Sequence, residues 1–176
     1  YRVKIATRNV NIPGIQNFRD LGGYPSYPGK KQMRWGMIYR SAEIDSLEYC
    51  SRRELKNLGI KTLIDLRTPS EIGRQSPLQK GFNVVHIPLA TGDMEDILQG
   101  IREEKIKCDT VYRMVERMNR TLIDKYTKEY RQIFDILLDK TNYPVVIHCS
   151  SGKGRTGIVS ALVLAALGVN EDIIME

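Results

Sequence analysis

The sequence predicts an α/β fold in which a central, mainly parallel twisted sheet carries helices on both faces. Short runs rich in Val and Ile alternate along the chain with longer segments whose apolar residues recur at helical spacing. The 176 residues, 41% of them hydrophobic, are enough for one well-filled core but few for two full domains. We therefore expect a single domain over residues 1–176, cut short at both ends.

The expected strands are short and bounded by Gly, Pro or polar residues. Residues 3–10 alternate loosely before a Pro-Gly pair, so residues 1–16 are expected to hold an edge strand or an entry arm. The expected core strands are residues 37–39, 61–66, 83–89 and 143–148. In a parallel sheet of this kind, ligands bind beyond the carboxyl ends of the strands.

Helical patterns separate these strands. Apolar residues between positions 47 and 58 fall on one face, and Asp45 with Glu48 three residues later resembles a capping box. Residues 109–140 keep helical spacing throughout and fit one long helix or two. Residues 158–167 are apolar and prone to form a helix directly after the loop described below.

Composition restricts the class of ligand. The 27 Lys and Arg residues against 21 Asp and Glu give a formal charge of +6, which favours anions. The basic residues do not form the clustered runs of a nucleic-acid binder. Cys50, Cys108 and Cys149 cannot all pair with one another and lack the C-x-x-C spacing of zinc sites. We expect free thiols, no metal and no cofactor.

No stretch of the sequence approaches the roughly 18 apolar residues that a membrane span needs. We therefore expect a soluble, monomeric domain without a membrane span. The cytoplasm is the favoured compartment, and an export signal would lie outside these residues.

The chemistry is expected in residues 148–157, HCSSGKGRTG, which lie between a strand and a helix. Glycines at 152 and 154 let successive backbone N–H groups turn inward around a phosphate dianion at a helix N-terminus. The same N–H groups should stabilise a thiolate at Cys149, making it a nucleophile. The expected phosphate-binding residues are Ser150, Ser151, Gly152, Lys153, Gly154 and Arg155.

Three further side chains in this loop have expected roles. The planar guanidinium of Arg155 can donate two parallel hydrogen bonds to equatorial phosphate oxygens. Thr156 can donate its hydroxyl to the Cys149 sulfur, and His148 is expected to fix the loop through backbone hydrogen bonds. Thr156 and His148 also fit a purely structural role.

His148-Cys149, five residues and then Arg155-Thr156 resemble the signature loop of the cysteine-dependent protein tyrosine phosphatase superfamily. Residues 17–24, 39–42 and 64–67 together with Glu71 resemble the atypical bacterial tyrosine and phosphoinositide phosphatases in particular. The resemblance spans nearly the whole chain. It implies hydrolysis of phosphomonoesters through a cysteinyl-phosphate intermediate, with protein phosphotyrosine as the first substrate class.

One departure from that group bears on the substrate. Its members typically carry Gly-Lys-Asp-Arg in the loop, whereas Gly154 replaces the aspartate here. The sequence Gly-Lys-Gly-Arg resembles instead the loop of lipid phosphatases related to the phosphatase-and-tensin type, where the lysine faces a phosphorylated inositol. Lys153 therefore keeps a phosphoinositide substrate open beside a phosphorylated protein or peptide.

The resemblance also implies a general acid on a loop after the strand that precedes the signature strand. Asp93 occupies that position, and Asp96 is the alternative. Asp93 also fits the N-cap of a short helix.

The remaining polar motifs are expected to be mainly structural. Arg19 and Asp20 are expected to form an ion pair that pins a turn. Asp65, Arg67 and Glu71 are expected to form one network at a strand end, and His86 a structural contact.

Two other functions share these motifs. A catalytically silent phosphate-recognition module would keep the same anion-binding loop. A sulfurtransferase would need no arginine clamp, and an arsenate reductase would need additional resolving cysteines.

Overall fold

The computed structural model describes residues 7–27, 31–45, 49–72, 81–90, 100–103, 105 and 108–175. Their central sheet has the strand order β1-β4-β7-β5-β6. Its strands are β1 (Arg19–Asp20), β4 (Ile38–Ser41), β5 (Thr62–Asp65), β6 (Asn83–His86) and β7 (Val145–His148). The pairs β4–β7, β7–β5 and β5–β6 are parallel, and only β1 runs antiparallel to its neighbour β4. The predicted mainly parallel sheet is confirmed.

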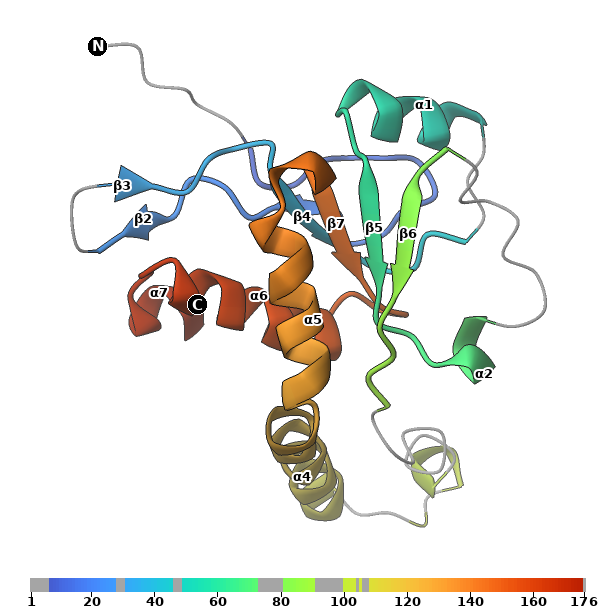
Figure 1. The fold of residues 1–176 in the computed structure, drawn as a ribbon. Coiled ribbons are helices and arrows are strands. Elements are labelled where there is room, and N and C mark those ends of the chain that lie inside the picture. The colour runs from blue at the N-terminus through green and yellow to red at the C-terminus, as the bar shows by residue number, and fades with distance from the viewer. Residues whose placement is uncertain are drawn as a thin grey trace.

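Helices flank this sheet and a small hairpin lies beside it (Figure 1). The helices are α1 (Tyr49–Asn57), α2 (Pro69–Ile72), α4 (Cys108–Lys125), α5 (Thr127–Leu138), the 3-10 turn η1 (Lys140–Asn142), α6 (Gly154–Ala166) and α7 (Glu171–Met175). The hairpin consists of β2 (Pro25–Ser26) and β3 (Lys31–Gln32). Among these helices none is long and apolar enough to cross a membrane.

The strands send alternate side chains to opposite faces of the sheet. In β7, Val145 and Ile147 belong to one hydrophobic cluster while Val146 belongs to the other. In β5, Ile64 and Leu63 divide between the clusters in the same way. This alternation follows from the two-residue period of a strand, and it requires cover on both faces.

Different parts of the chain provide that cover. On one face the sheet packs against apolar residues of the later helices, namely Leu122, Tyr126, Tyr130, Ile133, Val159 and Val163. On the other face it packs against Leu55 of α1 and against the N-terminal segment, namely Ile12, Ile15 and Phe18. Figure 1 shows α1 on one side of the sheet and α5 and α6 on the other. The expected cover of both faces by helices is therefore confirmed, with an added contribution from the N-terminal segment.

The expected entry arm is observed from residue 7 onward. Asn9 forms an isolated antiparallel bridge with Arg19, and the Val10 amide donates to the Phe18 carbonyl at 3.1 Å. Residues 7–16 contain no continuous strand among those that the structure describes. The segment therefore lies along the β1 edge as an arm.

The helical pattern over residues 109–140 forms two helices that meet at Tyr126. The backbone of Tyr126 has φ −104° and ψ 31°, which is outside the helical region. Its ring is buried, and its hydroxyl donates to the Ala90 carbonyl and accepts from the Ala90 amide at 3.1 Å. Docking of this side chain against a distant loop explains why the helix is interrupted there.

One local expectation is wrong, and another lies partly outside the described residues. The expected capping box of Asp45 and Glu48 involves residues 46–48, which lie outside the described residues, and the Asp45 carboxylate accepts hydrogen bonds from Arg67 at 2.5 and 2.7 Å. Asp20 forms no ion pair with Arg19 among the described residues. Its two carboxylate oxygens accept from the amides of Gly22 and Gly36, each at 2.7 Å, so Asp20 pins the turn through the backbone.

The sheet brings three strand ends to one edge. Ser41, His148 and Asp65 are the last residues of β4, β7 and β5, and they are direct partners in register. Segments that leave these strands therefore begin side by side, which places the loop after β7 next to those after β4 and β5.

The buried strands should dominate the stability of the fold. Leu63 is fully buried at the centre of β5. Leu63→Ala should lower the free energy of unfolding by about 2–5 kcal/mol, because it removes transfer energy and leaves a cavity. Leu138→Ala, at a position 79% exposed, should change it by less than about 0.5 kcal/mol. Urea unfolding followed by circular dichroism measures both, and equal effects would contradict this packing.

Candidate active site

The loop that joins β7 to α6 turns tightly at Gly152. Gly152 has φ +67°, and a Cβ atom there would lie 2.5 Å from the backbone carbonyl of Ser41. Only glycine fits this position without displacing the backbone. Gly154 is the first residue of α6, and a Cβ atom added there would meet no other atom within 4 Å, so the packing around this position leaves room for a side chain.

The carbonyl groups of the loop are hydrogen-bonded to the surrounding structure. Asn17 Nδ2 donates to the carbonyls of Gly152 at 2.9 Å and Ser151 at 3.3 Å. Arg40 Nη2 donates to the same Gly152 carbonyl at 2.8 Å and to that of Lys153 at 3.4 Å. The carbonyl of residue 150 accepts from the backbone amide of residue 43 at 3.1 Å. Four successive carbonyls are therefore fixed from outside the loop.

The N–H groups of the loop face the other way. In a trans peptide the C=O and the following N–H point in opposite directions. Fixing the carbonyls of residues 150–153 therefore directs the amides of residues 151–154 toward the inside of the loop. Among the described residues no protein acceptor takes a hydrogen bond from the amides of residues 150–153. Converging amides at the N-terminus of α6 form a site suited to an oxyanion.

Cys149 begins this loop immediately after β7. Its side chain is 1% exposed and packs within the cluster that also contains Ile147 and Val159. Cys149 is in no disulfide with any residue that the structure describes. The nucleophile candidate is therefore a buried thiol at the start of the loop, directly before the residues whose amides have no protein acceptor.

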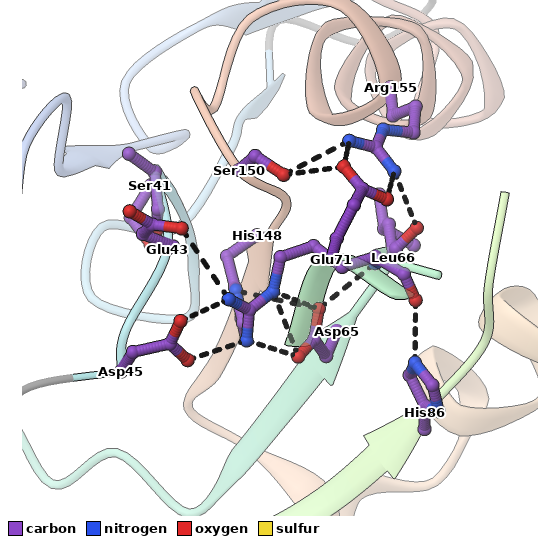
Figure 2. Close-up of polar contacts among 12 residues, drawn as sticks. Ser41, Glu43, Asp45, Asp65, Leu66, Glu71, His86, His148, Ser150 and Arg155 are labelled. Atoms are coloured by element: carbon purple, nitrogen blue, oxygen red, sulfur yellow. Dashed lines mark hydrogen bonds and ion pairs between the residues drawn. The ribbon is translucent and has the colours of Figure 1, made fainter. Parts of the chain in front are cut away.

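Arg155 ends the loop and pairs with a carboxylate from a different segment (Figure 2). Its Nη1 and Nη2 donate to the two carboxylate oxygens of Glu71 at 2.6 and 2.5 Å. Ser150 Oγ donates to Glu71 Oε1 at 2.7 Å and accepts from Arg155 Nη2 at 3.2 Å. Nη1 also donates to the carbonyls of Leu66 and Leu89, at 3.3 and 3.2 Å.

The guanidinium fork expected to hold phosphate is thus oriented by Glu71. The hydrogen bonds of the described residues use Nη1 and Nη2 of Arg155, and Nε takes part in none of them. The edge formed by Nε and Nη2 is the one that can turn to an oxyanion, with Ser150 Oγ giving way. Glu71 keeps the guanidinium group of Arg155 in position when no oxyanion occupies that edge.

Charge on both partners is stabilised by this contact. Burial alone would raise the pKa of Glu71, but hydrogen bonds from Arg155, Ser150 and Thr68 lower it to about 2. Burial alone would lower the pKa of Arg155, but hydrogen bonds and the negative charges of Glu71 and Cys149 raise it. Both groups are therefore ionised at neutral pH.

Glu71 is positioned by the first turn of α2. Thr68 precedes Pro69 at the first helical position, and Glu71 follows two residues later. The amide and hydroxyl of Thr68 donate to Glu71 Oε2 at 2.8 and 2.9 Å. The order Thr-Pro-Ser-Glu is the sequence signature of a capping box with proline at the start, so this signal was present in the sequence.

Arg67 forms a separate ionic network beneath the site. Its guanidinium is fully buried and donates to Asp65 at 2.8 to 3.2 Å and to Asp45 at 2.5 and 2.7 Å. Burial and hydrogen bonding to Arg67 act in opposite directions on Asp65, and the net effect lowers its pKa. Asp65 and Arg67 are thus a network at a strand end, as expected, whereas the expected place of Glu71 in it is wrong.

His86 makes the structural contact that the sequence favoured. Its Nε2 lies 2.5 Å from the Arg67 carbonyl, which links β6 to the segment after β5 (Figure 2).

His148 and Thr156 are buried without the contacts expected of them. Neither ring nitrogen of His148 nor the Thr156 hydroxyl has a hydrogen-bond partner among the described residues. The expected backbone hydrogen bonds from His148 are therefore not present, and its Nδ1 lies 3.8 Å from Asp65 Oδ1. Burial lowers the pKa of His148 to about 4, so the imidazole is neutral at pH 7.

Of the remaining candidate residues, two are exposed and two lie outside the described residues. Lys153 and Ser151 are exposed, and Lys153 is the N-cap residue of α6 without a side-chain capping bond. Asp93 and Asp96 lie outside the described residues.

Two residues that support the loop were not identified as functional candidates from the sequence. Asn17 and Arg40 belong to segments quoted only for their resemblance, yet they hold the loop carbonyls. Asn17 has φ +56°, a conformation that asparagine adopts more readily than most residues. An asparagine directly before a strand was therefore a local sequence signal for this backbone conformation. No sequence signal identified its hydrogen-bond partner, which lies 135 positions away.

Comparison with known proteins gives consistent matches. A profile of the tyrosine phosphatase family matches residues 10–176. The chain is 28% identical to the triple specificity protein phosphatase PtpB of Mycobacterium tuberculosis, over 93% of this chain and 66% of that protein. It is 30% identical to a candidate tyrosine-protein phosphatase of Cupriavidus necator, over 92% of this chain and 58% of that protein. A shorter segment, 24% of this chain, is 42% identical to inositol diphosphatase DSP4 of Arabidopsis thaliana and covers 22% of that protein.

The ion pair of Glu71 should make stability depend on pH. The pKa of Glu71 falls from 4.5 to about 2 on folding, so the stabilisation is complete above about 4.5 and is lost as pH falls through about 2. Glu71→Gln should therefore lower the free energy of unfolding at pH 7, and the difference from the parent should shrink between pH 4.5 and 2.

Urea unfolding at a series of pH values measures this difference. Glu116→Gln is the matched control, because Glu116 forms an exposed pair with Arg120 that contributes little. A difference for Glu71→Gln that stays constant down to about pH 2 would contradict the assignment.

Proposed function

Because the chain belongs to the tyrosine phosphatase family, we propose that it hydrolyses phosphomonoesters through a cysteinyl-phosphate intermediate, with protein phosphotyrosine as the first substrate class. The observation that supports this most strongly is that the carbonyls of residues 150–153 accept hydrogen bonds from groups outside the loop. It leaves the amides for an oxyanion directly beside Cys149. The chain spans 66% and 58% of the length of the relatives from Mycobacterium tuberculosis and Cupriavidus necator. A single catalytic domain over residues 1–176 is part of the proposal, and the family match over residues 10–176 supports it.

The first step transfers the phosphoryl group to sulfur. The Cys149 thiolate attacks phosphorus, a sulfur–phosphorus bond forms and the bond to the leaving oxygen breaks. The amides of residues 151–154 and the Nε edge of Arg155 bind the charge that develops on the equatorial oxygens. Glu71 keeps the Arg155 guanidinium oriented during this step, through the contacts at 2.5 and 2.6 Å.

The second step releases phosphate. Water attacks phosphorus and gives a proton to the carboxylate that donated one in the first step, the sulfur–phosphorus bond breaks and Cys149 returns as a thiolate. The buried Thr156 hydroxyl has no partner among the described residues, which supports its donating a hydrogen bond to the departing sulfur. The neutral His148 adds no positive charge next to Cys149.

The leaving oxygen needs a proton in the first step. Asp93 is the proposed donor, with Asp96 as the alternative, on the resemblance described above. Both follow β6, the strand that precedes β7 along the chain.

A phosphoinositide is the second substrate class. Lys153 is exposed on the loop and makes no side-chain cap, so its ammonium group is available to an additional phosphate. Similarity of part of the chain to a protein named inositol diphosphatase supports this class. The name of the Mycobacterium tuberculosis relative, a triple specificity phosphatase, also supports a broad range.

Turnover of a generic aryl phosphate tests the proposed activity. Cys149→Ser should lower the turnover rate by a factor on the order of 10⁶, because the nucleophile is lost. Arg155→Lys should lower the rate by roughly 10²–10³-fold, since lysine has no planar fork. Cys50→Ser is the matched control, and its turnover should equal that of the parent. A parent protein that binds phosphopeptides without any turnover would overturn the enzyme and favour a phosphate-recognition module.

A kinetic panel separates the two substrate classes. We expect higher kcat/KM on phosphotyrosine peptides than on phosphoinositides. Lys153→Ala should lower the ratio of phosphoinositide to phosphopeptide turnover by about 10-fold or more, since a charged contact is lost. Lys128→Ala, which removes an exposed lysine of α5, should leave this ratio unchanged. A phosphoinositide preference in the parent would replace phosphotyrosine as the first class.

A further inference from the structure

A second cationic pocket lies behind the signature loop. Its volume is about 370 Å³, within the range of small-ligand sites. Arg8, Arg19 and Arg40 line it, from the entry arm, β1 and β4, and small residues of α6 such as Gly157 and Ala161 close it. None of residues 148–156 contributes to its lining, so the pocket is separate from the space around Cys149.

The positive charge of this pocket is not balanced within the described part of the chain. Arg8, Arg19 and Arg40 form no ion pair with any carboxylate there. Asp20 is the one acidic residue of the lining, and its two oxygens already accept from the amides of Gly22 and Gly36. Three arginines therefore line one hollow together with a single carboxylate that is already engaged.

Arg40 is the most constrained of the three. Its Nη2 donates to the carbonyls of Gly152 and Lys153, while its buried Nε has no hydrogen-bond partner among the described residues. Burial and the positive charge of Arg19 lower the pKa of Arg40. A buried unpaired donor beside a like charge is unfavourable, and a bound anion would relieve both conditions.

Arg8 is held in position by an aromatic ring. Its guanidinium carbon lies 3.7 Å from the centroid of the Tyr24 ring, a stacked cation–π arrangement. Its carbonyl accepts from the Asp20 amide at 2.9 Å, which fixes the arm against β1. The guanidinium groups of Arg8 and Arg40 are therefore held in position before any ligand enters.

We propose that this pocket is a second, non-catalytic site for a phosphate group, supplied either as a phosphorylated headgroup or as free phosphate. Several guanidinium groups around one cavity match the bidentate acceptor geometry of a phosphate oxyanion. The proposal rests on Arg8, Arg19 and Arg40 and not on the phosphatase activity proposed above.

Backbone amide NMR signals of the nitrogen-15-labelled protein test the site. Signals of Asn9 and Ala161 report on the pocket, and signals of Ser151 and Gly154 report on the catalytic loop. Titration with inorganic phosphate and, separately, with soluble inositol trisphosphate should move the pocket signals saturably. A lower Kd for inositol trisphosphate would identify a headgroup as the source, and equal Kd values would identify free phosphate.

Charge-neutral variants decide whether the pocket arginines carry the binding. Arg19→Gln should raise the Kd read from the pocket signals by about 10-fold or more, because a charged hydrogen bond is lost. Arg8→Gln should do the same, and serves if Arg19→Gln does not fold. Arg113→Gln removes an exposed arginine of α4 and is the control, with the parent Kd expected.

Two results would overturn the proposal. One is movement of the loop signals alone with both ligands. The other is an equal Kd for the pocket variants and Arg113→Gln. Failure of the proposed phosphatase activity would appear instead as absent turnover, which these signals do not measure.

Discussion

The structure of the site depends on how the carbonyls of residues 150–153 are held. Asn17, Arg40 and the amide of residue 43 fix them from outside. Planar peptides then direct the following amides inward. Close contact of Gly152 with the Ser41 backbone sets the turn that makes these bonds possible. The inward direction of the loop amides is therefore produced by residues outside the loop.

A layer of buried charge supports this arrangement. Glu71 holds Arg155, and Asp65 with Asp45 holds Arg67 at the end of β5. Each guanidinium would be costly to bury alone, and the paired carboxylates compensate for that cost. Glu71 remains a partner of Arg155 when no anion is bound, and an oxyanion at the edge formed by Nε and Nη2 would have to displace only Ser150 Oγ.

The strands and the signature loop could be predicted from the sequence, whereas the long-range contacts that hold the loop could not. Short runs rich in Val and Ile located β4, β5, β6 and β7, and the order of Cys149, Gly152 and Arg155 identified the loop. The contacts that hold the loop join residues 135, 112 and 84 positions apart, for which periodicity gives no partner. The helical pattern over residues 109–140 left one helix or two open for the same reason, since the hydroxyl of Tyr126 binds a loop 36 residues away.

The most direct test of the central claim is a crystal structure of Cys149→Ser with phosphate bound. We expect phosphate oxygens within hydrogen-bonding distance of the amides of residues 151–154 and of Arg155 Nε, with Glu71 still paired to Arg155. A loop whose carbonyls point toward the anion, or a phosphate that binds away from residue 149, would contradict it.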